Sequence, residues 1–367
     1  VATVDLDLSG KTVFGGASVQ QGNGTVTVAD ISSAAGATNI ELIIDGINSM
    51  IGATNGSDIG SINQALVSIG ATPQALVVLN DYELSVGNLA ADTVIQGRAG
   101  VQNFIAGGLG SDTLIGADGA SNFIYGGAEV TTNATDENTI IGGNNRDFIA
   151  GGNEKDTISG GDGDDFISGG SGDDIISGGA GTDFIHAGEG SDTITVDNGA
   201  DYIDLGETTK VLDTVKFSEK TTSTSFILNF DISGTGTDDN LAFLESEFIS
   251  GNAGAKSVLG SGTSGVKFDL DTADFMGVVA IVDVAAANFS NAGAEIAAAI
   301  TNTAVDDAFV FLISDGSNTL VLGWDDRVAS GGNSNGLMDA NETTQIAMLV
   351  GVTSVFTIDA GNISILA

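Results

Sequence analysis

The stretch that most constrains the fold of this chain is a run of seven nine-residue units from Gly142 to Asp204, which follow one another without a gap. Every unit keeps Ile at its eighth place, and most units begin with two glycines. A flexible Gly/Asp-rich linker, the alternative interpretation, has no reason to keep Ile at this place. Every unit also keeps Asp at its sixth place: Asp147, Asp156, Asp165, Asp174, Asp183, Asp192 and Asp201.

The residue types explain how such a unit can fold. Paired glycines accept backbone angles closed to other residues, so six residues can form a tight turn with inward carbonyls, and three form a short strand whose middle side chain faces the core. Two units then make one coil, and equivalent residues of successive coils stack at about 4.8 Å, the ordinary strand spacing. The sequence therefore predicts a mainly β fold, a right-handed parallel β-roll.

Stacking of the coils would gather the sixth-place carboxylates into two ladders, each interleaved with turn carbonyls. All-oxygen sites suit calcium, which takes about six to eight oxygen ligands, better than zinc, which prefers nitrogen and sulfur. The chain has no Cys and one His, so a soft metal would find few ligands. We therefore predict several calcium ions, bound by the seven sixth-place aspartates, by Asp112 of an upstream unit, and by the turn residues Gly142, Gly151, Gly160, Gly163, Gly169, Gly172, Gly178 and Gly181.

Units such as GGDGDDFIS and GGSGDDIIS resemble the GGxGxDxUx repeat of the RTX, or haemolysin-type calcium-binding, proteins. The resemblance implies a secreted protein that folds in external calcium and leaves the cell through type I secretion machinery, which reads an uncleaved C-terminal signal. The closing TIDAGNISILA is similar to such a signal. The opening VATVDLDLSG has neither the cationic region nor the apolar core of a cleavable signal peptide.

A weaker form of the repeat extends upstream of Gly142, so we expect the roll to span residues 92–204. Asn103, Asn122 and Asn138 stand there at the sixth place. Asn lacks the charge of a carboxylate, so these coils should hold calcium weakly or be closed by side-chain amide bonds. The irregular stretch 128–137 is interpreted as a loop expelled from one coil.

The seventh place alternates between two kinds of residue, beginning at Thr93. One sheet is expected to carry mainly Thr on its outer face. The other would carry a ladder of six rings, which could be covered by the C-terminal part of the chain, by a neighbouring copy, or by a glycan ligand. The rings are Phe104, Phe123, Phe148, Phe166, Phe184 and Tyr202.

The sequences on either side of the roll have patterns typical of other elements. Residues 1–91 predict short strands and a helical pair, at 40–51 and 59–69, that cap the roll. Residues 205–367 predict a β-rich module with strands at 214–217 and 226–232, a helix at 294–300 and a hairpin of 308–314 with 318–324. A spacing similar to an EF-hand loop indicates either a calcium site or an ordinary polar turn at Asn333, Asn335, Asp339 and Glu342.

The net charge of -39 argues against nucleic acid and anionic membranes as partners, because both require a basic face. Cations are the expected partners, and the metal-free roll should repel itself until calcium arrives. Calcium would then act as a folding switch. No run of eighteen apolar residues is present, so no transmembrane segment is expected.

Catalytic motifs are absent from the sequence, which has no HExxH, no GxSxG and no Cys nucleophile. The single His186 stands at the ninth place of a unit, where it should point outward beside a turn; a Ser/His/Asp triad or hydrolase would have to use it. We therefore expect an extracellular structural protein, not an enzyme, that self-assembles into a surface layer or filament as a homo-oligomer or polymer. The alternative is the export and folding module of a larger secreted adhesin, toxin or hydrolase.

Overall fold

The computed structural model divides the chain into a first unit, Val1–Ile194 with Asp201–Thr209, and a second unit, Thr195–Ala200 with Lys210–Ala367. The helical pair expected at 40–51 and 59–69 lies outside the described residues. The residues that the structure describes are 17–20, 82–86, 92, 94–100, 102–107, 110–127, 137–218, 223–232, 237–244, 248, 261–263, 268–269, 278–282, 300–301, 308–325, 343–353, 358 and 362–366.

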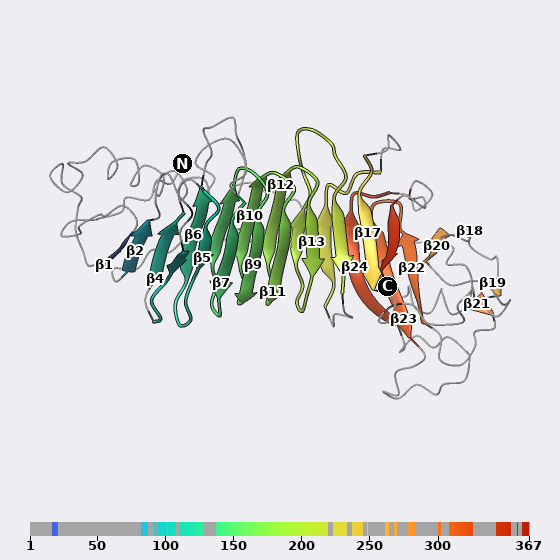
Figure 1. The fold of residues 1–367 in the computed structure, drawn as a ribbon. Helices are drawn as coiled ribbons and strands as arrows, with labels where there is room; N and C mark the ends of the chain where they lie inside the picture. The colour runs from blue at the N-terminus through green and yellow to red at the C-terminus, as the bar shows by residue number, and fades with distance from the viewer. Residues whose placement is uncertain are drawn as a thin grey trace. The chain divides into compact units, whose positions relative to one another are not determined.

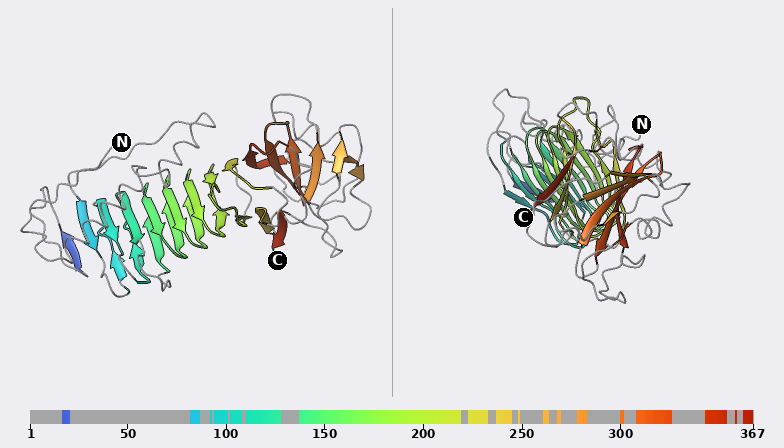
Figure 2. Two further views of the ribbon diagram at one scale, coloured as in Figure 1. Left: turned by 90° about the horizontal axis from the view of Figure 1, so that it is seen from above. Right: turned by 90° about the vertical axis from the view of Figure 1, so that its right-hand side faces the viewer.

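Two parallel sheets form the roll of the first unit, and their strands alternate along the chain (Figures 1 and 2). We name them the aromatic sheet and the threonine sheet. The aromatic sheet contains β2 (Tyr82–Val86), β4 (Gln102–Ala106), β6 (Asn122–Gly127), β8 (Phe148–Gly152), β10 (Phe166–Ser171), β12 (Phe184–Glu189) and β14 (Tyr202–Asp204). The threonine sheet contains β3 (Val94–Gln96), β5 (Thr113–Ile115), β7 (Thr139–Gly143), β9 (Thr157–Asp162), β11 (Ile175–Ala180) and β13 (Thr193–Val196).

The predicted period of one coil is confirmed by the strand register. In the aromatic sheet Phe148 pairs with Phe166, and Phe166 with Phe184; in the threonine sheet Thr157 pairs with Ile175. The eighth-place side chains point into the space between the sheets and form the core, where Ile167 and Ile176 are fully buried. The parallel β-roll expected from the repeats is therefore the fold of this part of the chain.

The register also shows that the two sheets continue across the irregular stretch, as an expelled loop there requires. Phe123 of β6 pairs with Phe148 of β8, and Thr113 of β5 pairs with Thr139 of β7. Both sheets thus continue in step across the irregular stretch, although residues 128–136 are outside the described ranges. The extra residues change the length of one connection and leave the coil period intact.

The start of the ladder at Thr93 is wrong by one residue. Val94 pairs with Thr113, so Val94 holds the seventh place, with 77% of its side chain exposed. The shift arises in the turn that follows β3. From its first-place glycine to its sixth-place residue, the turn Gly97 to Asn103 has one residue more than the regular turn Gly142 to Asp147. Before β3, the short strand β1 (Ala17–Gln20) pairs with β2 in the antiparallel sense.

Five of the six rings in the ladder of the aromatic sheet are buried, and Tyr202 is half-buried. Neighbouring rings stack in parallel, with centroids 4.6 to 5.1 Å apart. The phenylalanine rings keep at most 5% of their surface exposed in the single chain. The rings are therefore covered within the single chain, and because the described residues do not identify the cover, cover by the C-terminal part stays a prediction.

In the second unit, a mixed sheet joins β16 (Ser225–Leu228), β24 (Thr343–Val350), β23 (Thr319–Asp325), β22 (Ala308–Ser314), β20 (Val278–Val282) and β18 (Ser261–Thr263) in that order. The predicted hairpin is confirmed, because β22 and β23 pair antiparallel around Gly316, whose φ is 85°. The strand expected at 226–232 is shorter, since Asn229 has a φ of 60° and interrupts the extended backbone.

A second group of parallel strands in this unit contains β15 (Thr214–Phe217), β17 (Asn240–Leu244) and β25 (Ile363–Leu366). The two short strands β19 (Phe268–Asp269) and β21 (Ile300–Thr301) pair with each other. Ile300, placed at the end of a predicted helix, is therefore in a strand, and the rest of 294–300 lies outside the described residues. Over the described ranges, no helix is long and apolar enough to cross a membrane.

Candidate metal centre

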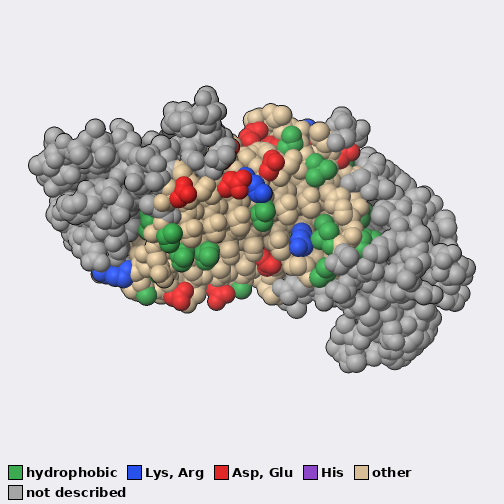
Figure 3. All heavy atoms as spheres, viewed as in Figure 1, with side chains coloured by type: hydrophobic (Ala, Val, Ile, Leu, Met, Phe, Trp, Pro, Cys, Tyr) green, Lys and Arg blue, Asp and Glu red, His purple; other side chains and the backbone are tan. Residues whose placement is uncertain are grey.

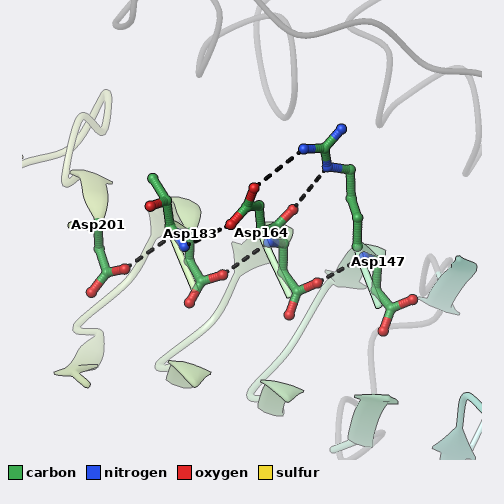
Figure 4. A network of polar contacts seen from close by, with 7 residues as sticks. Asp147, Asp164, Asp183 and Asp201 are labelled. Carbon is green, nitrogen blue, oxygen red and sulfur yellow. Dashed lines mark hydrogen bonds and ion pairs between the residues drawn. The ribbon is translucent and has the colours of Figure 1, made fainter. Parts of the chain in front are cut away.

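Two ladders of buried carboxylates run along the edges of the roll, as the sixth-place pattern predicts. In each ladder the backbone N–H of one Asp donates to Oδ1 of the Asp eighteen residues later (Figure 4). These carboxylates keep at most 2% of their surface exposed. The N–H to Oδ1 distances are 2.7 Å for Asp147–Asp165, 2.9 Å for Asp165–Asp183, 3.2 Å for Asp183–Asp201, 2.7 Å for Asp156–Asp174 and 2.8 Å for Asp174–Asp192.

The second carboxylate oxygen faces acceptors rather than donors. Asp165 Oδ2 lies against the Cα of Gly160, and the carbonyl oxygen of Gly178 in the next coil approaches the same point, so that a Cβ on Gly160 would overlap both oxygens. Two electronegative oxygens in a closed space repel each other unless a cation or a proton lies between them. The Oδ2 atoms that are buried and accept no hydrogen bond include those of Asp147, Asp156, Asp165, Asp174 and Asp183.

The remaining predicted residues take two roles in the turns. The first-place glycines Gly142, Gly151, Gly160 and Gly169 each leave room for a carboxylate Oδ2 and a carbonyl oxygen of the next coil, and Gly178 for the Oδ2 of Asp183. The fourth-place glycines adopt left-handed backbone angles: φ is 129° at Gly163, 120° at Gly172 and 143° at Gly181. Side chains are strained at such angles, so the fourth place sets the path of the turn while the first place makes space for the ligand oxygens.

Burial raises the pKa of these carboxyl groups, because the charged form loses its hydration. Neighbouring carboxylates add to the rise in pKa at Asp174, where Asp192 and Asp156 lie in the same ladder, while the Asp156 backbone N–H lowers it in part. Without metal the ladders therefore tend to hold protons. The pKa is raised to about 9 at Asp174, to about 8 at Asp165 and Asp183, and to about 7 at Asp147, Asp156 and Asp192.

Calcium fits this donor set, as an oxygen-rich site with one carboxylate per turn. Among the described residues, no three Asp, Glu or His side chains converge on one point. Backbone carbonyls must then supply most ligands, which suits the flexible coordination of calcium. The EF-hand-like residues Asn333, Asn335, Asp339 and Glu342 lie outside the described residues, so that site stays a prediction.

Asp112 has the same surroundings as the regular aspartates. A Cβ on Gly107 would overlap both Asp112 Oδ2 and the carbonyl oxygen of Gly126. Its backbone N–H donates to Asn138 Oδ1 over 2.9 Å. The upstream part of the roll thus contains one turn of the Asp kind among turns of the Asn kind.

The upstream asparagines are joined by amide hydrogen bonds, as expected. Asn103 Nδ2 donates to Asn122 Oδ1 over 2.7 Å, and Asn122 Nδ2 donates to Asp147 Oδ1 over 2.9 Å. Asn138 N–H donates to Asp156 Oδ1 over 2.8 Å. The asparagines therefore continue the ladders without adding charge.

The second unit contains a carboxylate pair that the sequence interpretation missed. Asp213 N–H donates to Asp239 Oδ1 over 3.0 Å, and Asn240 N–H donates to the Asp213 carbonyl over 2.8 Å, as in the roll. Asp239 Oδ2 is bonded by the N–H of Asp231. The available signal was an Asp two residues before a buried apolar residue, in DTV and DNL, without the glycines that mark a repeat.

His186 stands at the ninth place in β12, on the same face of the strand as Phe184, and has 7% of its surface exposed. The register aligns it with Ser168 of β10 and Asp204 of β14. Its Nδ1 lies 3.6 Å from Asp204 Oδ2.

A comparison with known protein families identifies repeats in the same stretch of the chain. The model of the RTX calcium-binding nonapeptide repeat matches in four copies, over residues 102–129, 141–176, 151–185 and 177–207. No curated protein and no solved structure matches the chain. The matches coincide with β4 to β14, where the carboxylate ladders lie. Over residues 102–129 and 141–207, the chain therefore contains RTX calcium-binding nonapeptide repeats.

Proposed function

We propose that this chain is an extracellular calcium-binding structural protein, whose roll folds when calcium binds after secretion. The observation that carries the proposal is the row of buried carboxylate Oδ2 atoms that accept no hydrogen bond and face the next coil, where the carbonyl oxygens lie. Calcium would bridge these oxygens and replace the protons that the raised pKa values otherwise favour. Low calcium inside a cell and high calcium outside would keep the calcium-requiring coils unfolded until type I export is complete.

Calcium titration of the whole chain tests the folding step. Far-UV circular dichroism should show less β structure in chelator than in calcium, with a cooperative gain of β structure as calcium is added. Magnesium is the matched control, because it demands a smaller octahedral site and gives up its water reluctantly. A spectrum that does not change between chelator and millimolar calcium would refute calcium-dependent folding.

We also propose that the folded chains assemble into a surface layer or filament. The outer face of the threonine sheet supports this role, because Ile141 and Ile175 expose 42% and 43% of their side chains there. Hydrophobic side chains lie scattered over one face of the roll, while acidic side chains gather along its margins (Figure 3). The buried ring ladder is unavailable for contact, so the threonine sheet is the face that a second copy would meet.

Electron microscopy of the purified chain tests assembly. Ordered sheets or fibres should form in calcium and dissolve in chelator. A strictly monomeric species in millimolar calcium would instead favour a folding and export module of a larger secreted protein. We infer no catalytic activity, since the one imidazole is buried beside Asp204.

A further inference from the structure

The turns of the roll are closed in two ways, which differ at the sixth place. In an Asp turn, a Cβ on Gly160 would overlap Asp165 Oδ2 and the carbonyl oxygen of Gly178. In an Asn turn, a Cβ on Gly116 would meet Asn122 Nδ2 at 2.7 Å and overlap the carbonyl oxygen of Gly142. The amide nitrogen thus lies where the second carboxylate oxygen lies in the other turns.

Because this atom is a nitrogen that carries hydrogens, the turn does not need a cation next to its carbonyl oxygens. Asn122 Nδ2 lies 3.0 Å from the carbonyl oxygen of Ala117, 3.5 Å from that of Ala120 and 3.5 Å from that of Gly142. Its two hydrogens are shared among these acceptors and Asp147 Oδ1, which lies 2.9 Å away, whereas an Asp oxygen in the same place would repel all of them. Carbonyl oxygens that would otherwise require a cation are therefore satisfied by the protein.

The same arrangement recurs at the other two asparagines. Asn103 Nδ2 donates to the carbonyl oxygen of Arg98 over 3.2 Å. A Cβ on Gly126 would meet Asn138 Nδ2 at 2.8 Å and would overlap the carbonyl oxygen of Gly151 in the next coil. Three turns of the upstream half thus place an NH₂ group against carbonyl oxygens.

We propose that the side-chain amides of Asn103, Asn122 and Asn138 take the place of calcium in their turns. The upstream half of the roll is then held closed largely without metal, and the calcium-requiring coils stack on it. This inference rests on the proposed function, because it assumes that the Asp turns bind calcium. According to this inference, the three asparagines determine which turns of the roll bind a metal ion.

The exchange Asn122→Asp tests the assignment in the full chain. Native mass spectrometry should count one more calcium ion than in the wild type, because the new Oδ2 would face the Gly142 carbonyl. The control is Asn144→Asp, which adds the same charge at an exposed turn residue whose Oδ1 accepts the Gly119 N–H. That control should bind the wild-type number of ions.

Hydrogen exchange in chelator gives a second readout. In the wild type, the amides of β4 and β6 should exchange more slowly than those of β10 and β12, and Asn122→Asp should remove this protection. An unchanged ion count in Asn122→Asp, or protection that persists in chelator, would overturn the inference. A wild type that binds no calcium would overturn the proposed function instead.

The reverse exchange keeps the test decisive if Asn122→Asp does not fold. Asp165→Asn should bind one calcium ion fewer than the wild type, yet keep more structure in chelator than Asp165→Ala, because only Asn supplies an amide donor. Equal structure of the two variants in chelator would contradict replacement of calcium by an amide.

Discussion

The sixth residue of each nonapeptide decides whether a turn needs metal. Asp and Asn have the same shape and both accept the N–H of the preceding coil, as at Asp165 and Asn138. Their second atoms differ, since an oxygen adds negative charge against a carbonyl and an NH₂ group donates to it. One atom therefore separates a calcium-requiring turn from a self-contained turn.

Replacement of Asp165 by Ala should weaken calcium-dependent folding more than replacement of its neighbour Asp164. Asp165→Ala removes a ligand oxygen and leaves the Asp147 N–H without its acceptor, which costs on the order of 2 kcal/mol. The calcium concentration at which half of the chains are folded should therefore rise at least about tenfold. Asp164 is half exposed and pairs with Arg146 at the surface, where such pairs contribute about 0–1 kcal/mol. Midpoints measured by circular dichroism should separate the two variants, and equal shifts would contradict the ligand assignment.

The metal-free roll should lose stability as pH rises. Its carboxyl groups have a pKa near 3.8 in the unfolded chain and about 7 to 9 in the fold, so the folded state binds more protons between these values. Stability is then fully present below about pH 4 and is lost toward pH 9, while calcium affinity increases because bound protons leave.

Circular dichroism in chelator at pH 5.5 and pH 8.5 measures this dependence. More β structure is expected at pH 5.5, and a calcium titration should reach its midpoint at lower calcium at pH 8.5. Asp174→Asn removes the carboxyl group whose pKa is raised to about 9, so its pH dependence should be shallower. More β structure in chelator at pH 8.5 than at pH 5.5 would exclude protonated carboxyl groups in the ladders.

At the level of the strands, the two sheets share one period but differ in what their outer faces meet. Phe166 in β10 is 1% exposed, whereas Ile175, at the same place in β11, is 43% exposed. Both side chains point away from the Ile core, so only the surroundings of each sheet distinguish them. The outer face of the aromatic sheet is therefore part of the packed interior.

Phe166→Ala should destabilise the calcium-bound roll by about 3–5 kcal/mol, because it leaves a cavity within the ring ladder. The ring stacks on Phe148 and Phe184 with centroids 5.1 and 4.7 Å away. Ile175→Thr, which matches the neighbouring Thr157 and Thr193, should change stability by no more than about 0.5 kcal/mol. Thermal unfolding in saturating calcium measures both, and a neutral Phe166→Ala would show that the ladder is open to solvent.

The coil period, the two ladders and the amide closure could all be predicted, because residue types repeat at fixed spacing. The position of Val94 could not, since one additional turn residue shifts the register without changing composition. Burial of the ring ladder depends on distant residues of the chain. The Asp213–Asp239 pair lacks glycines and regular spacing, so its only local signal was an Asp two residues before an apolar residue, which is too common to predict a pair.

For the whole molecule, charge and metal act together. A net charge of -39 expands the metal-free chain, and salt can screen that repulsion, but sodium cannot bridge a carboxylate and a carbonyl as calcium does. Size-exclusion chromatography should therefore show a large radius in chelator, a partial decrease in about 1 M sodium chloride, where the screening length is about 3 Å, and a full decrease only in calcium. Equal compaction by both salts would reduce the role of calcium to screening.

The ladder hydrogen bonds of the roll all run in one direction. In the regular coils each sixth-place N–H donates to the carboxylate one coil later in the chain, as from Asp147 to Asp165 and from Asp165 to Asp183. The seventh-place N–H groups run the other way, since the N–H of Phe166 donates to the Asp147 carbonyl one coil earlier. Loss of one coil therefore leaves backbone N–H groups without acceptors in both neighbouring coils, which proteins rarely tolerate, so that damage spreads toward both ends of the roll.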